Sequence, residues 1–487
     1  MTITIEGRRD LTLEAYARAA WRGEKVALGD MAMTAIERAR EGFLRYLANS
    51  PEGGVYGVNT GWGFNAKRRI RPDEQKAFDN RPLAIGAASF GDPLPNRVVR
   101  GILFARLANF VDGHSATSPR VVVAVIDMLN GTRPVPEVPG EGNGSAGEIL
   151  ALYHLFAPLS AAFDFEVKEK GGLVNGAPCA AALLADGALA ARRRLDLAFE
   201  VFALSFEALR APRTSLDPAL AALWNDGDAG AALDRLGRLL AGGEAPRRAY
   251  QAPVSFRILP RVLGRALRSA RVAAETADAI LPAVTDNPVY IPPDVDHPDG
   301  RSFSTGGYHD SHAVPALDAL AADGADLCLI AERHATKLLD GAVSGLPDKL
   351  LLNPAATAGG AGSVAYLPMA SVGVLETARA AALTTLLPGA EGGGFGQDDV
   401  VSPVFPAWRK QEAVGRALER ALAITAVIAS QAFHVTSRGA PPALAARLAR
   451  IRALAPPVDE ANPPAPGALA AALSENFRRE VYEGTEG

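Results

Sequence analysis

A loop with four glycines around one serine is the first place in this sequence where chemistry could be done. It reads PGEGNGSAGEILALYH over residues 139–154 and leads into an apolar run that predicts a helix from Glu148. Glycine permits positive φ and close backbone approach, and the free N–H groups at a helix start point back toward the preceding loop. The loop is therefore suited to hold an anion, to make a tight turn, or to carry the remains of a catalytic triplet near Ser145.

Three further polar loops carry candidate catalytic groups. YGVNTGWG offers Asn59 and Tyr56, and a tyrosine can act as a general base if its pKa is lowered; the alternative is a loop anchor. APVSFRILPR places Arg257 among apolar residues, where a guanidinium needs a carboxylate partner or a ligand. GQDDVVSP pairs Asp398 with Asp399, which could titrate apart if buried together or could cap a helix.

Other polar clusters favour simpler interpretations. His309, Asp310 and His312 are metal-binding residue types, but no second cluster accompanies them and we expect no metal. Asp286 and Asn287 in VTDNPVY have the chemistry of a structural turn. The sequence contains neither a Walker loop nor a GxSxG elbow, which argues against P-loop nucleotide and hydrolase chemistry.

Long segments with helical periodicity must position these loops. The long Ala- and Leu-rich segments cover residues 178–210, 216–241, 259–283, 312–340, 366–387 and 406–436. Further helical patterns cover 11–49, with a break at WRGEK, and 73–86, 96–130 and 148–156. Such lengths predict a packed helical bundle and a mainly α fold. Residues 163–174 are expected to be extended, and residues 455–466 to form a strap or linker.

From this pattern we expect three consecutive regions. A loop-rich, active-site region would cover residues 1–210, a central bundle of long helices 211–440, and a C-terminal tail 441–487. The chain carries 50 Lys and Arg against 54 Asp and Glu, which argues against nucleic acid or a membrane surface as partner. Cys179 and Cys328 are predicted to be buried free thiols, and with no signal-peptide pattern we expect a cytoplasmic protein.

Taken in order, these loops resemble those of the histidine, phenylalanine and tyrosine ammonia-lyase and aminomutase family. The resemblance covers about residues 10–440 and is carried by YGVNTGWG, GDPLPNRVVRGILFARLANFVDGHS, LVNGAP, VSFRILPRVLG, VTDNP, IAERH and GQDDVVS. It implies a mainly helical subunit with a long central bundle, assembled as a homotetramer whose active sites draw on loops of different subunits.

The family's electrophile, a methylidene-imidazolone (MIO), forms from an internal Ala-Ser-Gly. The resemblance puts Ser145, Ala146 and Gly147 on these positions, in a stretch that is one residue short. Ring closure expels two waters, one of which takes the β-hydroxyl of the central residue, and Ala146 has no such hydroxyl. We therefore predict a degenerate triplet and no cofactor. A shifted Gly144-Ser145-Ala146 triplet keeps a central serine, but puts a Cβ on the residue that closes the ring.

The resemblance also implies roles for other residues. Those matched to the family are Tyr56 as a base, Asn175 and Gln397 as polar contacts, and Arg257 as the partner of the substrate carboxylate. The candidate catalytic residues are thus Tyr56, Asn175 and Asp398. The candidates for substrate binding are Arg257, Gln397, Asn59, His309, Gly86 and Val254.

Several of these positions depart from the family pattern. Gly86 stands for a histidine, Val254 for a tyrosine and Asp398 for a glutamate. The family's GGNFHG phenylalanine falls on His309, or on Tyr308 if a gap is allowed. The smaller side chains at 86 and 254 predict a roomier or more apolar pocket.

A base and a carboxylate clamp without an electrophile favour an MIO-independent, lyase-like enzyme. It would eliminate, add or isomerise on a small carboxylate, amino-acid-like substrate that acidifies its own C–H or has a better leaving group than ammonia. Ordinary histidine or phenylalanine ammonia-lyase activity should then be very low. The alternatives are a genuine MIO enzyme that uses the shifted triplet, and a non-catalytic paralogue that binds ligands.

Overall fold

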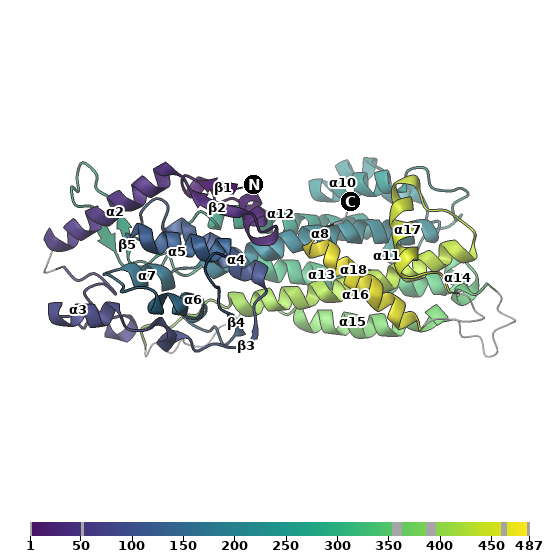
Figure 1. Cartoon of the computed structure of the whole chain (residues 1–487). Coiled ribbons are helices and arrows are strands. Elements are labelled where there is room, and N and C mark those ends of the chain that lie inside the picture. Colours follow the sequence, from purple (N-terminus) through teal and green to yellow (C-terminus); the bar gives the residue numbers. More distant parts are fainter. Residues whose placement is uncertain (1, 50–52, 353–362, 386–395, 459–464, 485–487) are drawn as a thin grey trace. The chain divides into compact units, whose positions relative to one another are not determined.

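The chain folds into two compact units, each assembled from separate stretches of sequence (Figure 1). The structure is a computed structural model that describes residues 2–49, 53–352, 363–385, 396–458 and 465–484. Unit 1 comprises Met1–Asp186, Ala273–Leu317 and Thr384–Trp408, and unit 2 comprises Gly187–Val272, Asp318–Leu383 and Arg409–Gly487. These units do not coincide with the three consecutive regions expected, because every unit boundary but one falls inside a helix.

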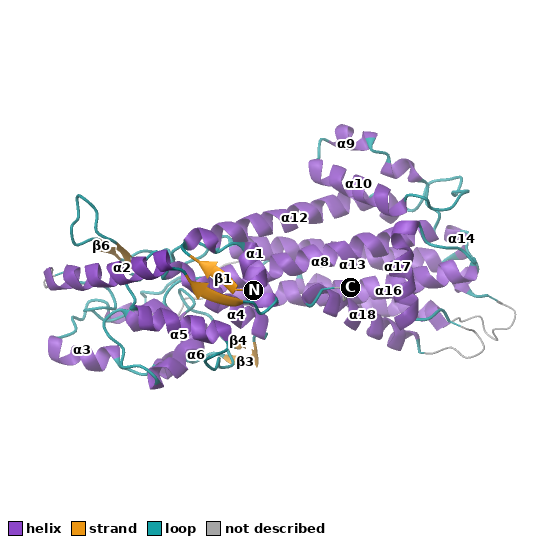
Figure 2. Cartoon of the chain, turned by 45° about the horizontal axis from the view of Figure 1, so that its top comes forward, coloured by secondary structure: helices purple, strands orange, loops and turns teal. Residues whose placement is uncertain are grey.

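Four long helices confirm the helical periodicity. They are α8 (Pro178–Ala208), α12 (Leu259–Ile280), α13 (Ala313–Leu339) and α16 (Val404–Val435). Inside unit 2, α8, α13 and α16 run side by side (Figures 1 and 2). Their core includes Phe202 and Phe256, which pack on the buried ring of His334. Burial lowers the pKa of His334 to about 3, so this histidine is a neutral core residue.

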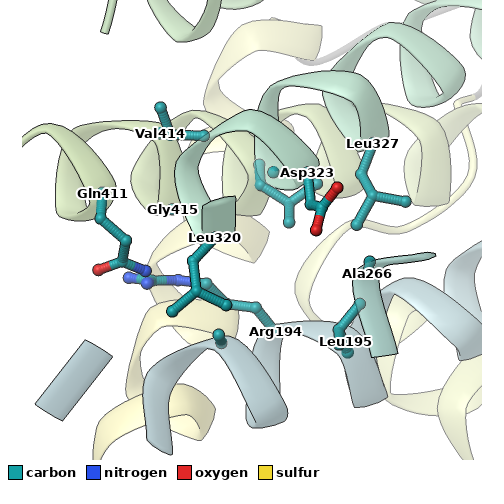
Figure 3. A pocket seen from close by; sticks show the side chains of 12 residues that line it. Arg194, Leu195, Ala266, Leu320, Asp323, Leu327, Gln411, Val414 and Gly415 are labelled. Atoms are coloured by element: carbon teal, nitrogen blue, oxygen red, sulfur yellow. The ribbon is translucent and has the colours of Figure 1, made fainter. Parts of the chain in front are cut away.

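Unit 2 also contains a small cavity between these helices (Figure 3). Its volume of about 30 Å³ is enough for only one or two waters. Arg194 lies at its edge, but its guanidinium is held by Glu419 at 2.8 Å, Glu412 at 3.1 Å and the Tyr482 hydroxyl at 2.7 Å. We therefore interpret this cavity as a packing defect around a buried ion-pair network.

Shorter helices complete unit 2. They are α9 (Ala219–Trp224), α10 (Gly227–Leu240), α11 (Val254–Arg257), α14 (Gly341–Ser344), α15 (Leu367–Ala381), α17 (Ala445–Leu454) and α18 (Pro466–Tyr482). The predicted helix 216–241 is divided into α9 and α10. Asn225 adopts a left-handed conformation after α9, and the carboxylate of Asp226 caps α10 by accepting the N–H of Ala229 at 3.1 Å. Of the expected linker 455–466, residues 459–464 lie outside the described residues.

In its described residues, unit 1 combines helices of up to 20 residues with three two-stranded sheets (Figure 2). Its helices are α1 (Leu13–Tyr16), α2 (Asp30–Asn49), α3 (Pro72–Asp79), α4 (Asn96–Arg106), α5 (Pro119–Asn130), α6 (Ile149–Phe156) and α7 (Glu169–Val174). The parallel sheet pairs β1 (Thr2–Ile5) with β2 (Lys25–Leu28). The antiparallel sheets pair β3 (Phe90–Pro93) with β4 (Pro139–Glu141), and β5 (Val289–Ile291) with β6 (Arg301–Phe303).

The expectation of an extended segment over residues 163–174 is wrong for its second half, which forms α7. This helix forms because of contacts that one of its side chains makes with other parts of the fold. The carboxylate of Glu169, in the first turn of α7, is buried and accepts the N–H of Glu166 at 2.8 Å. It also pairs with Arg120 at 2.7 Å. These contacts hold a short glycine-containing helix that local propensity does not favour.

The two cysteines are buried and free, as predicted. The segment Glu169–Ala208, which includes α8, is long and apolar enough to cross a membrane by composition. However, 89% of its most apolar window is buried inside the protein. Burial of this kind is typical of a helix in a protein core.

Candidate active site

A cavity of about 600 Å³ in unit 1 gathers loops that are far apart in the sequence. Its lining residues come from the 56–66 loop, the start of α6, the end of α7, the 304–308 segment and the 397–398 segment. Of the predicted site residues, those that line it are Tyr56, Ala146, Asn175, Gln397 and Asp398. The cavity is the default candidate for the active site, because catalytic groups usually converge on a large pocket that is already formed.

The glycine-rich loop places Ala146, not Ser145, against this cavity. Ser145 is only 5% exposed, and its hydroxyl donates to the carbonyl oxygen of Gly147 at 3.0 Å. Gly147 has a φ of +63°, a conformation that favours glycine. A glycine requirement at residue 147 agrees with the alignment that makes Gly147 the third residue of the triplet.

Glu148 anchors this loop to the first turn of α8. Its buried carboxylate accepts the backbone N–H groups of Cys179 and of Ala180, the latter at 2.6 Å. Burial raises the pKa of Glu148 to about 8, although these hydrogen bonds oppose the rise. The loop is thus fixed by a residue that does not line the cavity.

The hydroxyl of Tyr56 accepts the N–H of Gly63 at 2.9 Å. Burial raises the pKa of Tyr56, and the nearby Asp398 and Tyr308 act in the same direction. A lowered pKa, the condition under which Tyr56 could act as a base, is therefore not met in the chain by itself, and no cation among the described residues lines the cavity. A base role for Tyr56 requires a positive charge brought in by a ligand or by another chain.

Asn175 and Asn287 connect the walls of the cavity. The Asn175 amide donates to the carbonyl oxygen of Asn287 at 2.8 Å. The side-chain oxygen of Asn287 accepts the N–H of Thr305 at 2.9 Å and so holds the 304–308 segment. Behind them, the buried ion pair of Lys168 and Asp286 spans 2.7 Å. The turn at 286–287 therefore holds the cavity wall together, and Asn287 also lines the cavity.

Tyr153 lines the cavity and was missed by the sequence reasoning. Its ring packs directly on Gly86: a Cβ added to Gly86 would lie 2.2 Å from the tyrosine Cδ2. The ring of Tyr153 therefore fills the space directly above Gly86. That Gly86 makes the pocket roomier or more apolar stays a prediction. Burial raises the pKa of Tyr153 to about 12, and its hydroxyl has no hydrogen-bond partner within the described ranges.

Two other predicted residues lie outside the cavity lining for local reasons. Asn59 is a loop anchor: its side-chain oxygen accepts the N–H of Val55 at 2.7 Å, and its amide donates to Gly53 at 2.9 Å. Tyr308, the position that the gapped alignment gives, lines the cavity, whereas His309, the position that the ungapped alignment gives, does not. Between the two histidines that follow, Asp310 caps α13 by accepting the N–H of Ala313 at 2.7 Å.

Arg257 and Val254 belong to unit 2, on α11, and neither is among the residues that line the cavity of unit 1. The Arg257 guanidinium donates through Nε to the carbonyl oxygen of Ala252 at 3.0 Å, and Val254 is 57% exposed. No group of three His, Cys, Asp or Glu side chains in the described part of the chain is arranged to hold a metal.

Comparisons with known proteins agree with this architecture. The model of the aromatic amino acid lyase family matches residues 11–164 and 160–453. The histidine ammonia-lyase of Streptomyces griseus is 31% identical over 476 residues, covering 89% of this chain and 88% of the relative. That of Streptomyces avermitilis is 30% identical, with the same coverage of both chains.

Solved structures share the fold at low identity. The ergothioneine-degrading ergothionase of Treponema denticola superposes with a TM-score of 0.87 at 19% identity, covering 99% of both chains. The phenylalanine aminomutase of Pantoea agglomerans gives 0.86 at 20% identity, again with 99% of both chains covered. The Trypanosoma cruzi histidine ammonia-lyase gives 0.81 at 23% identity, covering 99% of this chain and 95% of its own. On the family model, the relatives and the helical fold together, this chain belongs to the aromatic amino acid lyase family.

Proposed function

We propose that this chain is a lyase that acts on an amino-acid-like carboxylate without an MIO group. The observation that carries the proposal is Ala146 at the centre of the triplet, beside a Gly147 whose positive φ suits the third position. The methylidene requires a β-hydroxyl on the central residue, and alanine has none. The residues present therefore do not fit the family's group, and no step of the proposed reaction passes through it.

Without an electrophile, the leaving group must depart unaided. Ammonia leaves poorly, whereas a quaternary α-ammonium leaves as a neutral tertiary amine that takes both electrons of the C–N bond. A base removes the β-proton, those C–H electrons form the Cα=Cβ bond, and the tertiary amine is released. The fold likeness to an ergothioneine-degrading enzyme supports this choice, because ergothioneine carries a trimethylammonium group on its α-carbon.

The cavity has the residue types that bind a quaternary ammonium. Five aromatic side chains line it, together with the carboxyl group of Asp398: Tyr56, Trp62, Phe64, Tyr153 and Tyr308. Aromatic faces attract such cations through the ring quadrupole. A bound cation would also lower the pKa of Tyr56 from its raised value and so favour the phenolate that serves as base. The substrate itself would thus supply the charge that the described lining residues lack.

The substrate carboxylate needs a cation from elsewhere, and we assign this role to Arg257 of a second copy in a homotetramer. Arg257 is flanked in the sequence by exposed apolar side chains, of which Tyr250 is 60%, Val254 57% and Ile258 39% exposed. Surfaces of this kind support contact with another subunit. A guanidinium suits a carboxylate because its planar fork donates two parallel hydrogen bonds. We place this assembly in the cytoplasm, in keeping with the two free cysteines.

The test has two parts. Mass spectrometry of the peptide covering residues 139–154 should give the mass of the plain sequence; loss of two waters within 144–147 would refute the proposal. The purified enzyme is then given L-histidine, L-phenylalanine and their α-trimethylammonium betaines. Trimethylamine and an unsaturated acid should form from a betaine, with little or no ammonia from the amino acids.

A second candidate is an MIO-type ammonia-lyase that uses Gly144-Ser145-Ala146. Its support is that relatives at 30–31% identity are histidine ammonia-lyases. In that case the peptide loses two waters and ammonia forms from an unmodified amino acid. A third, the non-catalytic ligand-binding paralogue, would show the plain mass and no turnover of either substrate class.

A further inference from the structure

A second cavity of about 260 Å³ lies beside the first in unit 1. The two cavities share Trp62 and Tyr153, which line both and so form the partition between them. Gly86 lines the second cavity only, where Tyr153 covers it. A ligand in the first cavity therefore has a neighbouring space bounded by the same two aromatic side chains.

The charged side chains that line this second cavity are all positive. Arg68, Arg81 and Lys170 line it, and none of its described lining residues is an aspartate or a glutamate. Arg68 pairs with Glu74 at 3.3 Å, an exposed contact that is worth little in water. The Arg81 guanidinium forms no ion pair or side-chain hydrogen bond with any residue in the described ranges. The cavity therefore has a cationic lining that the protein itself neutralises only in part.

Lys170 is the least expected of these cations because it is only 6% exposed. Its ammonium donates to the carbonyl oxygen of Phe78 at 2.6 Å and, more weakly, to that of Arg81 at 3.4 Å. It also lies 5.2 Å from the ring centroid of Trp62 and 5.3 Å from that of Phe78. An ammonium has three N–H donors, so one remains for a ligand.

The buried carboxylate that attracts Lys170, that of Asp79, is itself hydrogen-bonded to another side chain. Asp79 is engaged by Gln75, whose amide lies 3.1 and 3.0 Å from its two oxygens. Burial lowers the pKa of Lys170 to about 8 despite the attraction of Asp79, so the ammonium remains mostly charged at neutral pH. A buried, charged amine that faces a cavity without carboxylates points to an anionic ligand.

We propose that the second cavity binds an anionic group at the far end of the substrate, opposite the α-carbon. This inference rests on the proposed function, since it takes the first cavity as the place where the α-carbon reacts. The substrate class is then an aromatic amino acid or betaine whose ring carries a second acidic group, such as a carboxylate or sulfonate. Trp62 and Tyr153 would contact the ring, and Lys170 and Arg81 the anion.

Two compounds that resemble products test this directly. Cinnamate carries the α-side carboxylate alone, and 4-carboxycinnamate adds an anion at the opposite end of the ring. Calorimetry with the full-length protein should show that 4-carboxycinnamate binds at least about tenfold more tightly, as expected for one charge-assisted contact with the buried ammonium of Lys170. Equal affinities, or failure of 4-carboxycinnamate to bind, would overturn the proposal.

Substitutions of the lining cations test which side chains produce the preference for 4-carboxycinnamate. Lys170→Met should remove most of the preference for 4-carboxycinnamate and leave the affinity for cinnamate within about twofold. Because Lys170 is buried, the exposed Arg81→Gln provides a second variant without a folding risk, and should reduce the preference in the same direction. Lys76→Met, an exposed lysine on α3 that lines neither cavity, is the matched control and should change nothing.

An unchanged preference in both Lys170→Met and Arg81→Gln would refute the assignment of these cations. The proposed function fails separately, through the peptide mass and the identity of the released amine. If binding of 4-carboxycinnamate is preferred and the preference depends on Lys170, the anion site in the second cavity is supported, even if the peptide covering residues 139–154 has lost two waters.

Discussion

Replacing Gly86 by alanine should damage the active site through Tyr153. The new Cβ would lie 2.2, 2.4 and 2.5 Å from three atoms of the tyrosine ring, far inside the contact distance of about 3.5–4.0 Å between carbons. These atoms include Cγ, at the base of the ring, so a small rotation of the ring cannot relieve the overlap. Overpacking of this kind costs about 1–3 kcal/mol. Gly86→Ala should therefore lower the free energy of unfolding by that amount and move Tyr153 from its place between the cavities.

The pairing is tested by a double-mutant cycle. Tyr153→Ala alone removes a buried aromatic ring, which costs about 3–5 kcal/mol. The double variant Gly86→Ala/Tyr153→Ala has no clash. Its loss of unfolding free energy should therefore be about 1–3 kcal/mol smaller than the sum of the losses in the two single variants. Urea midpoints at fixed protein concentration, together with the affinity for cinnamate, measure both effects.

Gly144→Ala is the matched control, because a Cβ there meets nothing within 4 Å and should change stability by less than about 0.5 kcal/mol. Additive losses in the cycle, or a Gly86→Ala variant as stable as the Gly144→Ala control, would show that Tyr153 does not fill the space above Gly86.

Three further predictions follow from the site. Tyr56→Phe, which removes the proposed base, should lower turnover about a hundredfold or more and leave ligand affinity nearly intact, as steady-state kinetics and calorimetry can measure. Arg257→Lys should instead weaken binding about tenfold or more, and an unchanged affinity would contradict the role of Arg257 in binding the substrate carboxylate. Lys168→Met leaves Asp286 buried without its partner and should cost about 3–5 kcal/mol in urea unfolding, against little change for Lys67→Met on the surface. Because the pKa of Glu148 rises on folding from 4.5 to about 8, its contribution to stability is fully present below pH 4.5 and is lost as the pH rises to 8. Between pH 5.5 and 8 the urea midpoint should therefore fall less steeply with pH in Glu148→Gln than in the unsubstituted protein. Equal slopes in the two proteins would contradict a raised pKa of Glu148 in the folded state.

The sequence by itself determined the long helices and the family to which the chain belongs. Helical periodicity is a local property, so α8, α12, α13 and α16 were predicted to within a few residues. The loops matched to the family gave Tyr56, Asn175 and Asp398 as site residues, and all three line one cavity. Ala146 was singled out in the same way, because the resemblance places an alanine at the centre of the triplet.

Only the tertiary structure decided how these residues are arranged. Periodicity does not predict α7, because the buried carboxylate of Glu169 holds it through contacts with other elements. Tyr153 gives no local signal either: it matters because its ring occupies the space above Gly86, and that contact joins segments distant in the sequence. The same holds for the second cavity, where Arg81, from the loop after α3, and Lys170, from α7, come together. Side-chain packing and burial depend on which elements meet, and no pattern within one segment carries that information.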